Sequence, residues 1–152
     1  MLGALAAVAP TAAEAAPGAD SAMAPIRSLV RAHNKAFTEQ DLNGVLACFT
    51  DRATLMGTGP GELWTGAGEI ADAYRHFFLG FDAGRQKFED LWHEGHISGD
   101  TAWLMAVSKV TMNKGSKKDV FGVNLSLVCR NSGGKWQFST MHFSNLTGPA
   151  RG

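Results

Sequence analysis

The chain has 152 residues, and its 14 Lys and Arg side chains balance 14 Asp and Glu side chains, so the formal net charge is zero. This length is sufficient for one domain with a buried core and is short for two. No basic stripe or polybasic segment stands out in the sequence, so we expect neither nucleic acid nor a membrane surface as a partner.

The first part of the chain, residues 1–22, is rich in Ala and has no Lys or Arg. Its residues 2–8 are typical of the apolar core of a secretory signal, and Ala-Glu-Ala at residues 13–15 fits a cleavage site. The basic start of such a signal is missing, so a flexible Ala/Pro-rich tail is the alternative. The first interpretation predicts export to the periplasm or secretion, and the second a cytoplasmic protein.

Two helices are expected next. Apolar residues from Ile26 to Phe37 recur at the spacing of one helical face, and His33 shares that face. Asp41 is a plausible N-cap for a second, short helix, whose apolar stripe we expect to reach Phe49.

Residues 51–66 indicate a strand that is broken by a turn at Gly57–Gly61. A third helix is predicted to begin near Gly66 and to carry apolar positions as far as Phe81. Glu69 lies in its first turn, where the helix dipole favours an acid.

From residue 85 the apolar period changes to two, which is typical of strands. Short polar turns separate the predicted strands, which are residues 85–97, 101–112, 120–130 and 135–146. Helices followed by an antiparallel meander indicate an α+β domain, which we place at residues 23–148. The sheet must curve to enclose the helices, and this leaves a cavity between the two layers.

The two cysteines, Cys48 and Cys129, stand in apolar segments without a CxxC motif or metal-ligand spacing. We expect buried thiols, and a disulfide only if the chain is exported and the fold brings the two together.

Four segments, in this order, resemble the nuclear transport factor 2-like superfamily, and its SnoaL-like branch in particular. They are AFTEQDLNGVLACFTDRATLMG (36–57), WTGAGEIADAYRHFF (64–78), GDTAWLMAVSKV (99–110) and GGKWQFSTMHFS (133–144). The resemblance implies a cone-shaped curved antiparallel sheet wrapped around N-terminal helices, an internal pocket, and a homodimer formed through the outer face of the sheet. The last segment also resembles the association domain of the calcium/calmodulin-dependent kinase, with which it shares Gly-Lys-Trp-Gln and a downstream His-x-Ser.

The ketosteroid isomerase branch of this superfamily needs a carboxylate base on the first strand. That position falls at about Gly57, and the hydrogen-bond donor of the first helix falls at about His33, so the base is missing and the donor is changed. A cyclase of the SnoaL type instead needs a general acid or base inside the cavity. His142, His33 and Asp90 are candidates by residue type.

Strict alternation along the last strand places His142 and Ser144 on the face of Trp136. Because His142 also matches the His-x-Ser of the family, we expect it to point into the cavity. For His33 two interpretations stay open, a hydrogen-bonded core histidine and a residue that lines the pocket.

The segment WHEGH places His93 and His96 on opposite faces of a strand, so they are poor ligands for a common metal ion. Asp90 and Trp92 are expected to share a face. The sequence predicts no metal site and no cofactor.

Asn124 and Ser126 share one face of an otherwise apolar strand, where they are either solvent-exposed or polar anchors in a pocket. Four large aromatic side chains either wall the pocket or simply pack in the core. The candidate ligand-binding residues are His33, Trp64, Tyr74, Trp92, Trp103, Asn124, Ser126 and His142.

The first functional hypothesis is a pocket protein that binds a hydrophobic small molecule and forms a homodimer. Leu125, Met141 and Phe143 are expected on the dimer face. One alternative is a cyclase, isomerase or dehydratase that acts on a hydrophobic carbonyl compound with a histidine acid/base. The other alternative is a module that uses the fold only to oligomerise.

Overall fold

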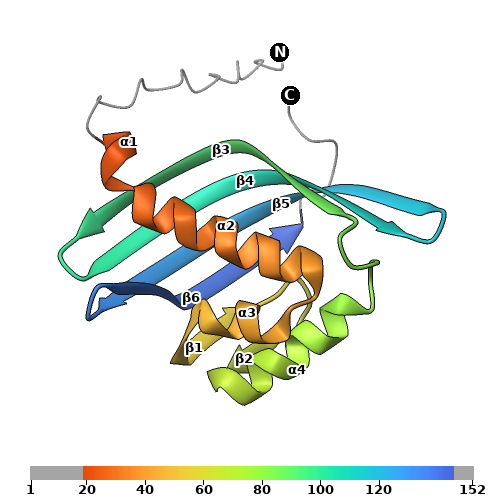
Figure 1. Ribbon diagram of the computed structural model, residues 1–152, viewed down its shortest axis with the longest axis horizontal. Helices are drawn as coiled ribbons and strands as arrows, with labels where there is room; N and C mark the ends of the chain where they lie inside the picture. The colour runs from red at the N-terminus through yellow and green to blue at the C-terminus, as the bar shows by residue number, and fades with distance from the viewer. Residues whose placement is uncertain (1–18, 146–152) are drawn as a thin grey trace, which may run out of the picture.

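The computed structural model describes residues 19–145, in which four helices pack against a six-stranded sheet (Figure 1). The helices are α1 (Ala19–Ala22), α2 (Ala24–Glu39), α3 (Leu42–Ala47) and α4 (Gly66–Phe78). The strands are β1 (Phe49–Met56), β2 (Leu63–Thr65), β3 (Gln86–Ser98), β4 (Thr101–Lys114), β5 (Lys117–Ser132) and β6 (Lys135–Asn145). Of the predicted signal or tail segment at residues 1–22, residues 1–18 lie outside the part of the chain that the structure describes.

The predicted helices are present, with small changes at their ends. Helix α2 ends because Gln40 adopts a left-handed backbone conformation with φ of 57°. Asp41 caps α3 as expected, since its carboxylate accepts a hydrogen bond from the Gly44 amide at 3.0 Å. Phe49 does not extend the stripe of α3 but begins β1, and α4 ends at Phe78 rather than at Phe81.

The sheet has the strand order β2-β1-β6-β5-β4-β3 and is curved but not closed. Strands β3 to β6 form the predicted antiparallel meander. However, β1 pairs with β6 in parallel, so the expected antiparallel sheet contains one parallel pair. A parallel pair requires a long connection, and here β2, α4 and the first three strands of the meander lie between β1 and β6.

Two strands of the meander each contain an extra residue. The pairing of β3 with β4 skips Leu91, between Asp90 and Trp92. The pairing of β6 with β5 skips Ser139, between Phe138 and Thr140. Each bulge reverses the faces of all the residues that follow, because side chains alternate along a strand.

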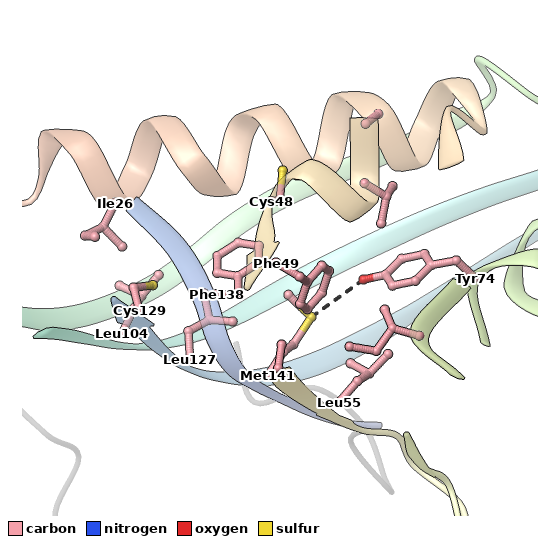
Figure 2. Packing of buried hydrophobic residues seen from close by; sticks show 14 of the residues in the cluster. Ile26, Cys48, Phe49, Leu55, Tyr74, Leu104, Leu127, Cys129, Phe138 and Met141 are labelled. Carbon is pink, nitrogen blue, oxygen red and sulfur yellow. Dashed lines mark hydrogen bonds between the residues drawn. The ribbon is translucent and has the colours of Figure 1, made fainter. Parts of the chain in front are cut away.

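The core lies between α2 and the inner face of the sheet (Figure 2). Its largest fully buried side chains are Phe138, Ile26, Leu55, Ile70, Val45 and Cys129.

Cys48 and Cys129 are buried free thiols, and burial raises the pKa of both, that of Cys129 to about 12. Within residues 19–145 no helix has the length and apolar character that crossing a membrane requires.

The outer face of the sheet carries several large apolar side chains that are exposed to solvent. They include Trp92, Trp103, Met105 and Val128, which lie on β3, β4 and β5. In the register of the sheet Trp92 stands beside Val107, and Trp103 beside Val128. We call the four exposed residues Trp92, Trp103, Met105 and Val128 the outer apolar patch.

Candidate functional site

A cavity of about 640 Å³ lies between helices α2 and α4 and the inner face of the meander. This volume is within the usual range for small-molecule sites. Much of its wall is apolar, with Phe37 from α2, Leu104 from β4, Leu127 from β5, and Phe138 and Met141 from β6. The cavity can therefore accommodate a small apolar molecule.

A hydrogen-bonded pair of buried polar side chains, His33 and Tyr74, borders the cavity. His33 comes from α2 and Tyr74 from α4, and imidazole Nε2 lies 2.6 Å from the phenol oxygen. Nδ1 of His33 lies 3.2 Å from Oδ1 of Asn34. The tautomer with its proton on Nδ1 fits both contacts, because the ring then donates to Asn34 and accepts from Tyr74.

Burial controls the charge of this pair. Desolvation lowers the pKa of His33 from 6.5 to about 4, against the opposing hydrogen bond to Asn34. Desolvation also raises the pKa of Tyr74 far above its ordinary value. Both side chains are therefore neutral near pH 7. Figure 2 shows the Tyr74 hydroxyl oxygen beside Met141 Sδ, 3.8 Å away, so this thioether is the alternative acceptor for the one phenol proton.

A second polar pair, Asp90 and His93, lines the cavity from β3. Nδ1 of His93 lies 2.5 Å from Oδ2 of Asp90. Residues three apart normally point to opposite faces of a strand, but the bulge at Leu91 brings these two to the same face. With the carboxylate accepting from Nδ1–H, Nε2 of the imidazole is left as a proton acceptor.

The cavity-lining positions on β3 that sequence reasoning missed are Gln86, Phe88 and His93. Gln86 and Phe88 follow from simple alternation along β3 once the inner face is known. His93 does not, because the bulge that turns it inward leaves no local sequence signal. The expectation that Asp90 and Trp92 share a face is wrong for the same reason.

Among the candidate site residues, His33, Tyr74 and Asp90 line the cavity. For His33 both interpretations hold, because it is buried and hydrogen-bonded as well as cavity-lining. Trp64 packs against Phe77 of α4 with ring centroids 5.6 Å apart, behind the cavity wall.

The other candidates lie on the outer face, away from the cavity, so the expectation that they line it is corrected. These are Trp92, Trp103, Asn124, Ser126 and His142. For His142 the cause is the bulge at Ser139, after which Met141 and Phe143 point inward and His142 points out. Asn124 and Ser126 face out because their neighbours Leu125 and Leu127 line the cavity.

The three residues that were expected on an outer dimer face lie instead on the inner face of the sheet. Leu125, Met141 and Phe143 line the cavity and contribute to the core side of the sheet.

The described residues contain no group of three or more His, Cys, Asp or Glu side chains placed to hold a metal ion.

The sequence of residues 26–148 matches the family model of the SnoaL-like domain. The chain belongs to the SnoaL-like domain family. The resemblance expected from the sequence is therefore confirmed, and so are the α+β class and the curved sheet around N-terminal helices. No curated protein matches the sequence.

Solved structures of similar fold include a candidate dehydratase of the nuclear transport factor 2-like family from Streptomyces avermitilis. It has a TM-score of 0.75 and 14% identity, over 85% of this chain and 99% of that chain. A ketosteroid isomerase-like protein from Erwinia carotovora atroseptica has a TM-score of 0.67 and 26% identity, over 83% and 97%. A candidate calcium/calmodulin-dependent protein kinase II association domain from Xanthomonas campestris has a TM-score of 0.70 and 18% identity, over 80% and 85%.

Proposed function

We propose that this SnoaL-like protein binds a small, largely apolar molecule in the cavity between α2 and the sheet. The observation that carries the proposal is the 640 Å³ cavity itself, which combines an extended apolar wall with a few buried polar groups. Apolar walls supply affinity through burial, and a few fixed polar groups orient the ligand. His33 and Tyr74 are such groups, held neutral by burial.

Two adjacent residues of β4 provide a matched test. Ala106 lines the cavity and Val107 points to the outer face. We expect Ala106→Phe to fill part of the cavity and to weaken calorimetric binding of 2-methylnaphthalene at least about tenfold. Val107→Phe should leave the affinity unchanged. Equal affinities in the two variants, or no binding by the wild type, would contradict the proposal.

A second candidate function is proton transfer to and from the bound molecule, and it is favoured by the hydrogen-bonded pair Asp90–His93 on the cavity wall. His93 Nε2 takes a proton from the carbon beside a carbonyl group. Return of that proton to a different carbon completes an isomerisation, and its delivery to a β-hydroxyl group that leaves as water completes a dehydration. Among structures of this fold are a candidate dehydratase and a ketosteroid isomerase-like protein.

Hydrogen–deuterium exchange on carbon tests the second candidate without knowledge of the natural substrate. In D₂O the wild type should accelerate exchange at the α-carbon of 2-tetralone, followed by proton NMR. His93→Gln should abolish the acceleration, and His96→Gln, on the outer face, should retain it. If exchange proceeds at the uncatalysed rate with the wild type, the catalytic role fails while the binding role stands.

The outer apolar patch supports assembly of the binding protein as a homodimer. Its members are large, apolar and exposed on one face of the sheet, which is typical of a surface that another chain covers. In sedimentation equilibrium we expect a dimer that dissociates in Trp103→Lys. Leu79→Lys, at an exposed position beyond the end of α4, should remain a dimer. A wild-type monomer would refute the assembly.

A further inference from the structure

Gln86 combines deep burial with an amide group that has no partner. It is 9% exposed, and neither Oε1 nor Nε2 has a hydrogen-bond partner within the described part of the chain. Gln137 shows the usual situation, because its Nε2 donates to the carbonyl oxygens of Ala47 and Phe49 at 3.1 and 2.8 Å. Buried polar atoms in native proteins are nearly always paired, so an unpaired amide requires an explanation.

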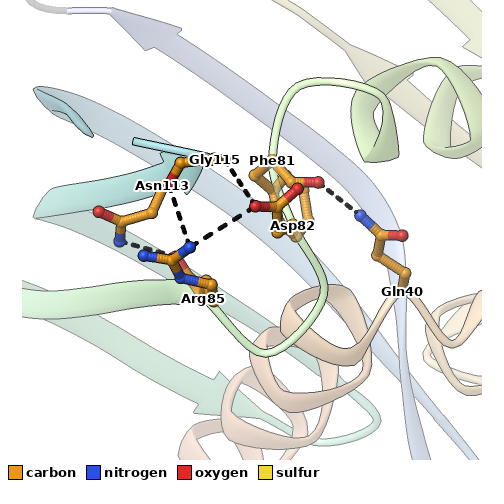
Figure 3. A network of polar contacts seen from close by, with 6 residues as sticks. All are labelled: Gln40, Phe81, Asp82, Arg85, Asn113 and Gly115. Atoms are coloured by element: carbon orange, nitrogen blue, oxygen red, sulfur yellow. Dashed lines mark hydrogen bonds and ion pairs between the residues drawn. The ribbon is translucent and has the colours of Figure 1, made fainter. Parts of the chain in front are cut away.

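The position of Gln86 is fixed by its neighbours in sequence. Figure 3 shows the polar network that holds the preceding loop against the β4–β5 hairpin. Arg85 donates to the Gly115 carbonyl at 3.1 Å and its own carbonyl accepts from the Asn113 side chain at 3.0 Å. Asp82 accepts from the Gly115 amide at 2.7 Å. The backbone of Gln86, the first residue of β3, is therefore held in place by contacts of its neighbours and not by its own side chain.

The side chain of Gln86 reaches the cavity at the end where it meets a shallow groove on the surface. Gln86, Phe88, Arg31 and Asn34 border both spaces. Arg31 donates one hydrogen bond to Ser28 at 3.0 Å, and Oδ1 of Asn34 accepts from His33. By contrast, neither amide atom of Gln86 has a hydrogen-bond partner among the described residues. Gln86 therefore holds an unused donor and an unused acceptor at the edge of the cavity. Both atoms are covered by neighbouring protein atoms, and a change of side-chain rotamer turns them toward a ligand.

We propose that Gln86 is the specificity-determining contact for a neutral amide group of the ligand, a carboxamide or a lactam whose N–H and C=O lie on the same side. The proposal rests on the binding function proposed above and names the class of ligand. Such a group donates to Oε1 and accepts from Nε2 at once. A carboxylate can pair only with Nε2 of Gln86, and its negative charge then lies close to Oε1, which it repels. A hydrocarbon leaves both amide atoms unpaired. Phe88, the next inward-facing residue, contacts the apolar body beyond the amide.

The test compares three probes with the same ring system by isothermal titration calorimetry. Naphthalene-2-carboxamide can make both hydrogen bonds, methyl naphthalene-2-carboxylate only accepts, and 2-methylnaphthalene does neither. We expect the wild type to prefer the carboxamide over the ester by about tenfold, because the ester leaves Oε1 unpaired. In Gln86→Leu this preference should disappear while the affinity for 2-methylnaphthalene is retained or increased.

Stability separates the ligand role from a structural one. Gln86→Leu should unfold in urea at an unchanged or higher concentration, because it removes an unpaired polar group from the interior. Gln137→Leu, which removes a paired amide, should unfold at a lower concentration and keep the carboxamide preference. Gln86→Met is the second variant if Gln86→Leu does not fold, and a fold that tolerates neither substitution would overturn the ligand role.

The outcomes distinguish the two proposals. Equal affinities of the wild type for all three probes overturn the role of Gln86 but leave the cavity as a binding site. A carboxamide preference that survives in Gln86→Leu also overturns it, because another group must then recognise the amide. If the wild type binds none of the probes, the binding function itself fails.

Discussion

Acidification should destabilise the fold through His33. Desolvation lowers the pKa of this imidazole from 6.5 to about 4, so the unfolded chain takes up the proton at a higher pH than the folded chain does. The contribution of His33 to stability is therefore complete above pH 6.5 and is lost as the pH falls toward 4. By linkage the loss is about 2 kcal/mol at pH 5 and about 3 kcal/mol at pH 4.

The assay is urea denaturation of the wild type and of His33→Gln between pH 7.5 and pH 4. Carboxylates titrate in both proteins, so only the difference between the two free energies of unfolding reports on His33. That difference should shrink by about 2 kcal/mol between pH 7.5 and pH 5. His96→Gln, at an exposed position on the outer face, should follow the wild type throughout. Parallel curves for wild type and His33→Gln would refute the reasoning.

Three further predictions concern the packing and the helix capping of the fold, two of them with a matched control substitution. Tyr74→Phe should lower the free energy of unfolding by about 1–3 kcal/mol, because Nε2 of His33 loses its partner; an unchanged urea midpoint would contradict the pairing. Gly95→Ala should cost about 1–3 kcal/mol, since a Cβ there would lie 2.6 Å from a backbone oxygen of β4. The same exchange at Gly68, with nothing within 4 Å, should be neutral or stabilise by up to about 1 kcal/mol, and equal melting temperatures of the two variants would refute the contrast. Asp41→Ala should cost about 0.5–2 kcal/mol through loss of the α3 cap, and calorimetry should show Asp41→Asn to be close to the wild type.

The elements and their order could be predicted from the sequence because each depends on local chemistry. The spacing from Ile26 to Phe37 specifies a helix, and Asp41 provides a cap that the structure contains. The change to period two near residue 85 specifies the meander, and a meander after helices has few ways to bury its apolar face.

The faces of the strands could not be predicted beyond the bulges. A bulge depends on how two strands pair, and this is set by contacts between segments that are distant in sequence. One skipped residue, Ser139, was sufficient to turn His142 out of the cavity, and Leu91 did the opposite for His93. Alternation alone therefore assigned the wrong histidine of the sheet to the cavity.

Binding inside the cavity is the central claim, and methyl NMR tests it most directly. Leu127 and Val128 are consecutive residues of β5, the first on the cavity wall and the second on the outer face. On titration with 2-methylnaphthalene we expect the methyl resonances of Leu127 to shift and to saturate, and those of Val128 to stay in place. Shifts confined to Val128 would place the ligand on the outer apolar patch, and unchanged resonances at both residues would contradict binding altogether.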